Sequence, residues 1–258
     1  MSPALPARRH AVLVKPSVAA AEQEAASLIA QLLVAGPNAV LGLATGRSMI
    51  GVYEELVRRC ERGDVSFARA QSFNLDEYCG LPAEHPASFA AYMDRHLFGA
   101  VDIDPARAHL PDGNAPDGAR AYEDAIAAAG GIDLQLLGIG RNGHIGFNEP
   151  GSDRDTRTRI VDLAQETRKA NAPDFPDGLP VPDRAITMGI ATIMKARRIV
   201  LLATGAAKAE ALADALEGAV GKHNPASFLR LHPDVTIVCD PEAAHTLTPP
   251  TEMEKRHG

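Results

Sequence analysis

The residues best suited to chemistry in this 258-residue chain lie in one stretch, LGIGRNGHIGFNEPG, from Leu137 to Gly151. An apolar run, Leu134 to Ile139, leads into it and predicts a buried strand. Five glycines of the stretch surround His144, Glu149 and the amide of Asn142. Glycine permits positive φ and close approach of a ligand, at an entropic cost that a plain connecting loop rarely justifies. The imidazole and carboxylate could form a general acid–base pair, although a glycine-rich turn with a solvent-facing histidine has the same pattern.

A second candidate set, Thr45, Gly46, Arg47 and Ser48, follows the apolar run Ala39 to Leu43 and opens a helical pattern. Backbone N–H groups at a helix N-terminus, together with the helix dipole, bind phosphate. No Gly-Lys-Ser/Thr sequence follows at the spacing of a nucleotide-binding loop, which argues against a nucleotide. The alternative is an ordinary strand–helix turn capped by Thr45 or Ser48.

Two further strand ends carry charged residues. Lys208 lies just inside a predicted helix and would be a second cation near the same anion, unless it is a solvated surface lysine. Asp76 and Glu77 follow the apolar run Ser72 to Leu75. One of the two carboxylates could be a base, because burial and a like-charged neighbour both raise a carboxyl pKa. The alternative for Asp76 is a helix N-cap or a loop salt bridge.

Alternation of apolar runs with helix-periodic segments predicts an α/β fold, a single domain whose open, mostly parallel, Rossmann-like sheet has helices on both faces. The predicted strands are Ala11–Val14, Ala39–Leu43, Ser72–Leu75, Leu134–Ile139, Ile199–Ala203 and Val235–Cys239. The predicted helices are Val18–Val34, Met49–Arg62, Ala119–Ala129 and Ala206–Ala219. Four loops that carry candidate residues follow strand carboxyl ends, where open α/β sheets bind ligands. The sequence therefore predicts one active site at that edge.

The expected domain covers residues 1–247. A proline-rich segment from Ala172 to Asp183 is predicted to be a long non-helical loop, and loops of this length in compact domains often act as active-site lids. The tail, residues 248–258, is charged and aperiodic, so we expect it to be disordered.

Composition narrows the function. With 45% hydrophobic and 23% charged residues the chain is ordinary for a soluble globular protein. Its net charge of −7 argues against a nucleic-acid-binding surface, which usually shows as a basic patch. The charge does not exclude a phosphorylated small molecule, because local cations and helix N-termini bind anions inside acidic proteins.

Cysteines and apolar runs bear on location. Cys60, Cys79 and Cys239 are scattered singly, without metal-ligand spacing or an even-numbered disulfide framework. We expect reduced thiols, as in the cytoplasm. No apolar run approaches the roughly 20 residues that span a bilayer, and the short run after Arg8 and Arg9 does not match a signal peptide. The sequence predicts no membrane partner.

LGIGRNGHIGFNEPG, together with FNLDEYCGL at Phe73 to Leu81, closely resembles the glucosamine-6-phosphate deaminase family, from about Ala39 to about Asp240. The resemblance implies conversion of glucosamine 6-phosphate and water to fructose 6-phosphate and ammonia, in amino sugar catabolism. It implies neither a metal nor an organic cofactor. The partner would be a phosphorylated amino sugar, and a homo-oligomer is possible.

The resemblance also assigns roles. The residue that matches Asp76 abstracts the C2 proton of the opened sugar, and the histidine that matches His144 moves the proton during ring opening. The carboxylate that matches Glu149 orients and tunes that histidine. At Asn142 some members carry aspartate and others asparagine, so the supporting group here is neutral. The phosphate ligands remain those that the loop chemistry itself predicts, Thr45–Ser48 and Lys208.

Two departures from the family pattern are visible. Members commonly carry a phosphate-binding arginine where this chain has Pro173. Allosteric bacterial members use a serine pair and a basic pair where this chain has Ser152, Asp153, Arg159 and Val161. The first departure leaves the preferred sugar phosphate open, and the second predicts loss of activation by N-acetylglucosamine 6-phosphate.

Two other functions remain alternatives. A 6-phosphogluconolactonase would share the architecture and a histidine between glycines, but hydrolysis of a lactone needs no base at C2, for which Asp76 is suited. A sugar-phosphate-sensing effector domain would need a DNA-binding module, and the ten or so residues before the first strand are too few for a helix-turn-helix.

Overall fold

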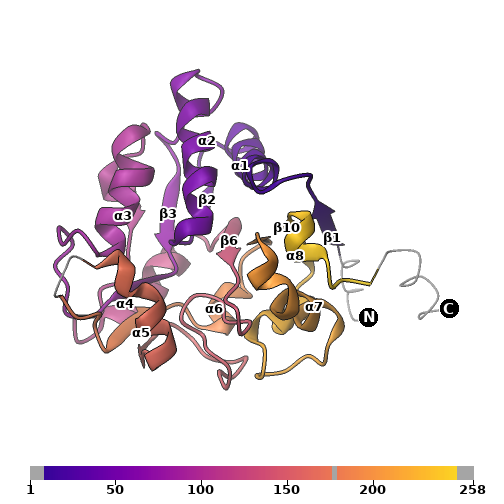
Figure 1. The fold of residues 1–258 in the computed structure, drawn as a ribbon. Helices are drawn as coiled ribbons and strands as arrows, with labels where there is room; N and C mark the ends of the chain where they lie inside the picture. The colour runs from indigo at the N-terminus through magenta and orange to yellow at the C-terminus, as the bar shows by residue number, and fades with distance from the viewer. Residues whose placement is uncertain (1–8, 176–178, 249–258) are drawn as a thin grey trace, which may run out of the picture.

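The computed structural model describes residues 9–175 and 179–248 of the chain (Figure 1). Most of the predicted disordered tail, residues 249–258, lies outside the described residues. Its first residue, Thr248, donates its backbone N–H to Glu217 Oε1 at 2.7 Å and its hydroxyl to Glu217 Oε2 at 2.8 Å.

A seven-stranded sheet forms the centre, and every strand pair in it is parallel. In spatial order its strands are β1 (Arg9–Val14), β10 (Asp234–Cys239), β9 (Arg198–Ala203), β6 (Leu134–Gly138), β2 (Val40–Leu43), β3 (Gln71–Asn74) and β5 (Ala108–His109). The six predicted strands are confirmed, with ends that agree to within two residues. Only β5, a two-residue edge strand, gave no apolar run that could be recognised.

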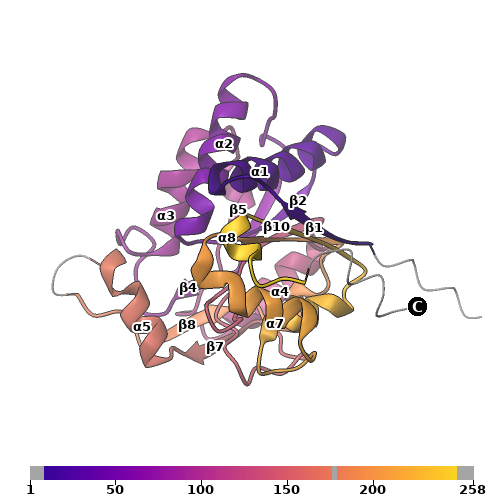
Figure 2. The ribbon, with the colours of Figure 1, turned by 45° about the vertical axis from the view of Figure 1, so that its right-hand side comes forward.

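Helices cover both faces, as expected for strands that are apolar on both sides. They are α1 (Val18–Ala35), α2 (Ile50–Glu61), α3 (Phe89–His96), α4 (Gly118–Ala128), α5 (Gln165–Asn171), α6 (Ile190–Ile193), α7 (Ala209–Glu217) and α8 (Pro241–Ala244). α1 and α2 lie on one side of the sheet, and α4 and α7 lie on the other (Figure 2). The predicted helices at Met49 and Ala206 begin instead with 3₁₀ turns, η1 (Arg47–Met49) and η5 (Ala206–Lys208).

The first helix, α1, is longer and more apolar than the sequence interpretation recognised. By length and composition, the 18 residues of α1 with mean hydropathy 1.2 could cross a membrane. In the fold, however, Ala25, Ile29 and Leu33 lie in the main hydrophobic core, and α1 packs against α2, β9 and β10. A core helix of a soluble protein meets the same criterion, so α1 is weak evidence for a membrane span.

The strand order places a topological switch point between β2 and β6. From β2 the chain moves outward to β3 and β5, then returns to β6 beside β2 and continues in the other direction to β9 and β10. In open α/β sheets the crevice at such a reversal, outside the strand carboxyl ends, binds the ligand. The loops that follow β2 and β6 flank this crevice, and they are the two loops that the sequence marked most strongly.

A second, smaller sheet was not predicted. β4 (Asp76–Tyr78), β8 (Arg184–Thr187) and β7 (Arg159–Asp162) form an antiparallel sheet in the order β4-β8-β7, next to α5 (Figure 2). Its strands are three or four residues long and include Arg and Asp, so no apolar run marks them. A second hydrophobic cluster lies with this sheet, formed by Tyr78, Ala87, Phe147, Leu163, Phe175, Val181 and Ala185.

The prediction that Ala172–Asp183 is wholly non-helical is wrong at its start. Ala172–Asp174 forms a 3₁₀ turn directly after α5, and Pro173 occupies its first turn, where a missing N–H costs no internal hydrogen bond. Phe175 and Val181 are buried in the second cluster. Residues 176–178 lie outside the described residues, and the role of this segment as a lid stays a prediction.

Candidate active site

The two adjacent carboxylates after β3 have separate tasks. Glu77 accepts the backbone N–H groups of Phe89 at 2.9 Å and Ala90 at 2.8 Å, which are otherwise unpaired at the start of α3. Asp76, the first residue of β4, pairs with Thr187 of β8, and it is 6% exposed. Glu77 rather than Asp76 therefore binds the start of α3, whose N-cap is Ser88, and the Asp76 carboxylate takes no part in this contact.

Asp76 is electrostatically suited to accept a proton. Burial, and secondarily the charge of Glu77, raise the pKa of the Asp76 carboxyl from 3.8 to about 8. A carboxylate with so high a pKa is a stronger base than an exposed aspartate. Ionisation of Asp76 in the folded protein is therefore unfavourable at neutral pH.

That pKa has a consequence for the pH dependence. Because the base form of Asp76 exists above its pKa, we expect kcat/KM to fall about tenfold per pH unit below about pH 8. The carboxyl can be titrated directly by ¹³C NMR, with an Asp76→Asn variant to assign the signal. A midpoint near pH 4 would contradict the buried-base interpretation.

The glycine-rich loop after β6 brings a second motif to Asp76. A Cβ atom on Gly140 would lie 2.3 Å from the His144 ring, so only glycine lets the imidazole rest on this backbone. Gly146 has φ +55°, and a Cβ there would lie 3.4 Å from Asp76 Oδ2. The loop backbone thus packs against the carboxylate. Phe147 strengthens the contact by donating its N–H to Thr187 Oγ1 at 3.1 Å.

His144 and Glu149 are brought together as the sequence predicted. His144 Nδ1 lies 3.4 Å from Glu149 Oε2, a contact too long for a strong hydrogen bond. Asn142 donates from Nδ2 to the same carboxylate oxygen at 2.7 Å and accepts the His144 backbone N–H on Oδ1 at 3.2 Å. The other oxygen, Glu149 Oε1, accepts the Thr167 hydroxyl at 2.5 Å. Thr167 was not among the predicted site residues.

The Glu149 carboxyl is held ionised. Burial alone would raise its pKa, but the facing His144 imidazole and the hydroxyl and amide donors of Thr167 and Asn142 lower it to about 2. Glu149 is thus a fixed negative charge beside His144 Nδ1.

The two candidate phosphate loops have the same local geometry. Gly46 has φ +114° and Gly205 has φ +84°, and each is followed by a 3₁₀ turn that leads into a helix. A Cβ on either glycine would meet nothing within 4 Å, so the space beside each turn is open. No side chain caps η1, so the capping role considered for Thr45 or Ser48 is not what the structure shows.

Lys208 is half-buried rather than a solvated surface lysine. Burial, and then the charge of Arg141, lower the pKa of its ammonium group. Arg141 lies in the loop after β6, and β6 is the sheet neighbour of both β2 and β9, the strands that precede the two glycine turns. Neither cation forms an ion pair with any residue in the described ranges 9–175 and 179–248. The sequence interpretation missed Arg141, although its place in the loop was visible.

The site is assembled from four strand ends. Asn142, His144 and Glu149 form one connected group, and Asp76 lies against the backbone of the same loop at Gly146. Thr45–Ser48 and Lys208 occupy the loops after β2 and β9, the strands on either side of β6. In the described part of the chain, no cluster of three or more His, Cys, Asp or Glu side chains is placed to hold a metal ion.

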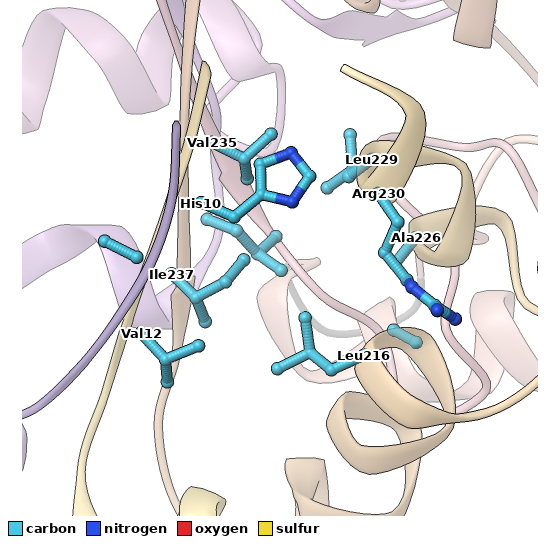
Figure 3. Close-up of a pocket in the computed structure, with 11 residues that line it drawn as sticks. His10, Val12, Leu216, Ala226, Leu229, Arg230, Val235 and Ile237 are labelled. Carbon is cyan, nitrogen blue, oxygen red and sulfur yellow. The ribbon is translucent and has the colours of Figure 1, made fainter. Parts of the chain in front are cut away.

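An enclosed pocket elsewhere is not a substrate site. It has a volume of about 40 Å³ and lies between β1, β10 and α7, with His10, Val235 and Leu216 in its lining (Figure 3). Ligand sites usually measure roughly 300–1,000 Å³. His10 and Val235 are at the amino ends of their strands, away from the carboxyl edge that carries the acid–base residues.

The positions that match the activator site of allosteric members are occupied by internal contacts. Asp153 pairs with Lys222 at 3.2 Å, and Arg159 donates to Asn148 Oδ1 at 2.9 Å. Val161 packs against the second hydrophobic cluster. Asp153 would repel a phosphate, and Val161 supplies no cation.

We therefore expect no activation by N-acetylglucosamine 6-phosphate. Rate curves against substrate should be hyperbolic and should not change when the acetylated sugar phosphate is added. Sigmoidal curves that become hyperbolic on its addition would contradict this expectation.

The fold and the candidate residues together define a class: an α/β protein with titratable and cationic side chains gathered at a topological switch point. The chain belongs to the family of glucosamine-6-phosphate isomerases and 6-phosphogluconolactonases, whose family model matches residues 15–238.

Curated relatives support this membership over almost the whole chain. The glucosamine-6-phosphate deaminase of Rhodopirellula baltica is 52% identical over 237 residues, which cover 91% of this chain and 94% of the relative. That of Halothermothrix orenii is 47% identical over 239 residues, 92% of this chain and 99% of the relative.

Solved structures agree in fold. A monomeric glucosamine-6-phosphate deaminase superimposes with TM-score 0.87 at 45% identity, covering 91% of this chain and 99% of that one. The 6-phosphogluconolactonase of Trypanosoma brucei superimposes with TM-score 0.73 at 20% identity, covering 94% of this chain and 100% of that one. The second likeness is one of fold alone.

Proposed function

We propose that this protein is a glucosamine-6-phosphate deaminase, which converts glucosamine 6-phosphate and water to fructose 6-phosphate and ammonia. The observation that carries the proposal is the buried Asp76 carboxylate, which lies against the loop that holds His144 and Glu149. The identity of about 50% to curated deaminases supports it.

The first step opens the sugar ring. His144 takes the proton of the C1 hydroxyl as the bond from C1 to the ring oxygen breaks, and it delivers a proton to that oxygen. Glu149, ionised beside Nδ1, stabilises the imidazolium between the two transfers. Asn142 holds the same carboxylate in place without adding a charge of its own.

The second step moves a hydrogen between carbons. The C1 aldehyde formed by ring opening acidifies the C2 proton, and Asp76 accepts it. The C1 oxygen takes up a proton at the same time, which gives an enolamine. Return of the proton from Asp76 to C1, with loss of a proton from the nitrogen, leaves a C2 imine, which water hydrolyses to the ketone and ammonia. The 6-phosphate is held by the Gly46 turn and by Lys208, at the far end of the substrate from C2.

The two alternatives fit the site less well. Opening a lactone requires attack of water at C1 and no proton abstraction at C2, so a base with the raised pKa of Asp76 would have no task. A sugar-phosphate sensor has no need of an ordered His144–Glu149 pair.

The deciding experiment measures ammonia release from glucosamine 6-phosphate and, separately, from galactosamine 6-phosphate. Hydrolysis of 6-phosphogluconolactone is measured with the same enzyme preparation. We expect ammonia from glucosamine 6-phosphate and its loss in the Asp76→Asn variant. Lactone hydrolysis without ammonia release would overturn the proposal, and a preference for galactosamine 6-phosphate would revise the substrate.

A separate prediction concerns the phosphate ligands. Pro173 cannot replace the family arginine, so we expect Arg47 to be the main charged ligand, because guanidinium binds two phosphate oxygens at once. Arg47→Ala should raise KM roughly 10- to 100-fold with little change in kcat, because a hydrogen bond to a charged group contributes about 1.5–3 kcal/mol.

Kinetics of Lys208→Ala and Arg141→Gln should be measured beside it. If Arg47→Ala leaves KM within about twofold of wild type while one of the other two raises it strongly, compensation by Arg47 is wrong. Arg120→Gln, a change at an exposed pair with Asp117, is the control for a lost surface charge.

We also propose a cytoplasmic location, in keeping with three cysteines that form no disulfide. One similar deaminase is described as monomeric. Gel filtration with light scattering would show whether this chain is a monomer or a homo-oligomer.

A further inference from the structure

We propose that Thr167 is a positioning residue, through which helix α5 orients Glu149 and thereby controls the ring-opening step. This inference rests on the proposed deaminase function. Its structural basis is the bond of the Thr167 hydroxyl to Glu149 Oε1 at 2.5 Å.

The Glu149 carboxylate is oriented from two sides. Its Oε2 atom receives the Asn142 amide at 2.7 Å and faces His144 Nδ1 at 3.4 Å, and both of these residues belong to the β6 loop itself. Its Oε1 atom receives Thr167, which belongs to a different element. A carboxylate held by only one oxygen can rotate, whereas bonds at both oxygens fix the direction in which Oε2 faces the imidazole. Thr167 therefore completes the orientation.

Helix α5 is itself anchored to the other catalytic motif. Asn171, at its last turn, donates to the Tyr78 hydroxyl at 2.8 Å, and Tyr78 is two residues from Asp76 on β4. Leu163 before the helix and Phe175 after it are buried in the second hydrophobic cluster.

A further ion pair, Arg168 to Asp183 at 2.6 Å, ties α5 to the segment that precedes β8. The last turn of α5 thus contacts β4, the strand that carries Asp76, and the middle of α5 contacts Glu149.

The consequence is a selective effect on one step. Glu149 serves His144, which acts on the ring, and among the described residues its carboxylate contacts Asn142, Thr167 and His144 rather than Asp76. Loss of the Thr167 hydroxyl should therefore slow opening of the cyclic sugar and leave proton abstraction at C2 almost unchanged.

The experiment compares Thr167→Val, which is close in shape but cannot donate, with Thr167→Ser, which keeps the hydroxyl. On glucosamine 6-phosphate we expect Thr167→Val to lower kcat roughly 10- to 100-fold, as loss of a hydrogen bond to a charged group predicts. Thr167→Ser should stay within about threefold of wild type. Thr248→Val, which removes a hydroxyl bonded to the Glu217 carboxylate at the last residue of α7, is the matched control.

The same variants are then assayed on 4,5-dideoxyglucosamine 6-phosphate, which lacks the hydroxyls that close a five- or six-membered ring. We expect Thr167→Val to act on it within about threefold of wild type. Equal losses on the cyclic and acyclic substrates, or failure of Thr167→Ser to restore turnover, would overturn the proposal.

A measurement without turnover separates this inference from the proposed function. The groups that face Glu149 are His144, Asn142 and Thr167, so removal of the Thr167 donor should raise the Glu149 pKa above its value of about 2. ¹³C NMR titration of the labelled carboxyl measures it. A raised pKa in an enzyme that releases no ammonia would support Thr167 while refuting the deaminase proposal. An unchanged pKa would refute the role of Thr167 in an active enzyme.

Discussion

Replacing Asp76 by asparagine is expected to abolish exchange of the substrate C2 proton with solvent deuterium, with turnover lower by about 10²–10⁴-fold. An amide cannot accept the proton at neutral pH, yet it has the same size as the carboxylate, so substrate binding should persist. The exchange is measured by ¹H NMR in deuterium oxide, and binding by calorimetry. Near-normal exchange in the variant would rule out Asp76 as the base.

The same variant should be more stable than the wild-type protein. Asp76 ionises with a pKa near 3.8 when unfolded and about 8 when folded, so at neutral pH the unfolded state releases a proton that the folded state retains. The resulting loss of stability begins as pH rises above the unfolded pKa and grows until pH passes the folded pKa. An asparagine has no such cost. Thermal unfolding at pH 7 should therefore show a higher Tm for Asp76→Asn, and a lower Tm would argue against a buried carboxyl.

Replacing His144 by glutamine is expected to cause a similarly large loss, about 10²–10⁴-fold, but only where ring opening limits the rate. The side chain lies against Gly140 and faces Glu149, in the β6 loop, whereas the C2 base comes from β4. Because different residues carry out the two proton transfers, ring opening can be lost while proton abstraction at C2 continues. Turnover of glucosamine 6-phosphate should fall strongly, and turnover of the acyclic analogue should change little.

Glu149→Gln provides the matched test of the second member of the pair. It removes the negative charge beside Nδ1 while keeping the size of the side chain, so its defect should also be confined to the cyclic substrate. Equal damage to cyclic and acyclic substrates by His144→Gln would contradict the division of roles between His144 and Asp76.

Much of the chemistry followed from the order of residues along the chain. Apolar runs end where the parallel strands β2, β3, β6 and β9 end, and parallel strands bring their carboxyl ends to one edge. Candidate residues that follow such runs must therefore gather there. The spacing of His144 and Glu149 within a glycine-rich loop was enough to predict their contact, because both lie on one short piece of backbone.

Other features depend on contacts between distant parts of the chain. Glu77 rather than Asp76 binds the start of α3, and which of two adjacent carboxylates does so depends on the pairing of β4 with β8. That pairing belongs to the antiparallel sheet, whose strands are too short and too polar to stand out. The pKa of Asp76 likewise comes from burial that no neighbouring residue specifies.

By itself, the sequence determined the strand–helix order and the edge of the sheet at which the candidate residues gather, because these follow from local periodicity and from the loops that end the strands. Only the tertiary structure decided that Thr167 holds Glu149 and that Arg141 approaches Lys208. The physical reason is separation along the chain. The Thr167 hydroxyl is 18 residues from the Glu149 carboxylate, and the two groups come into contact only when α5 and both sheets have packed together.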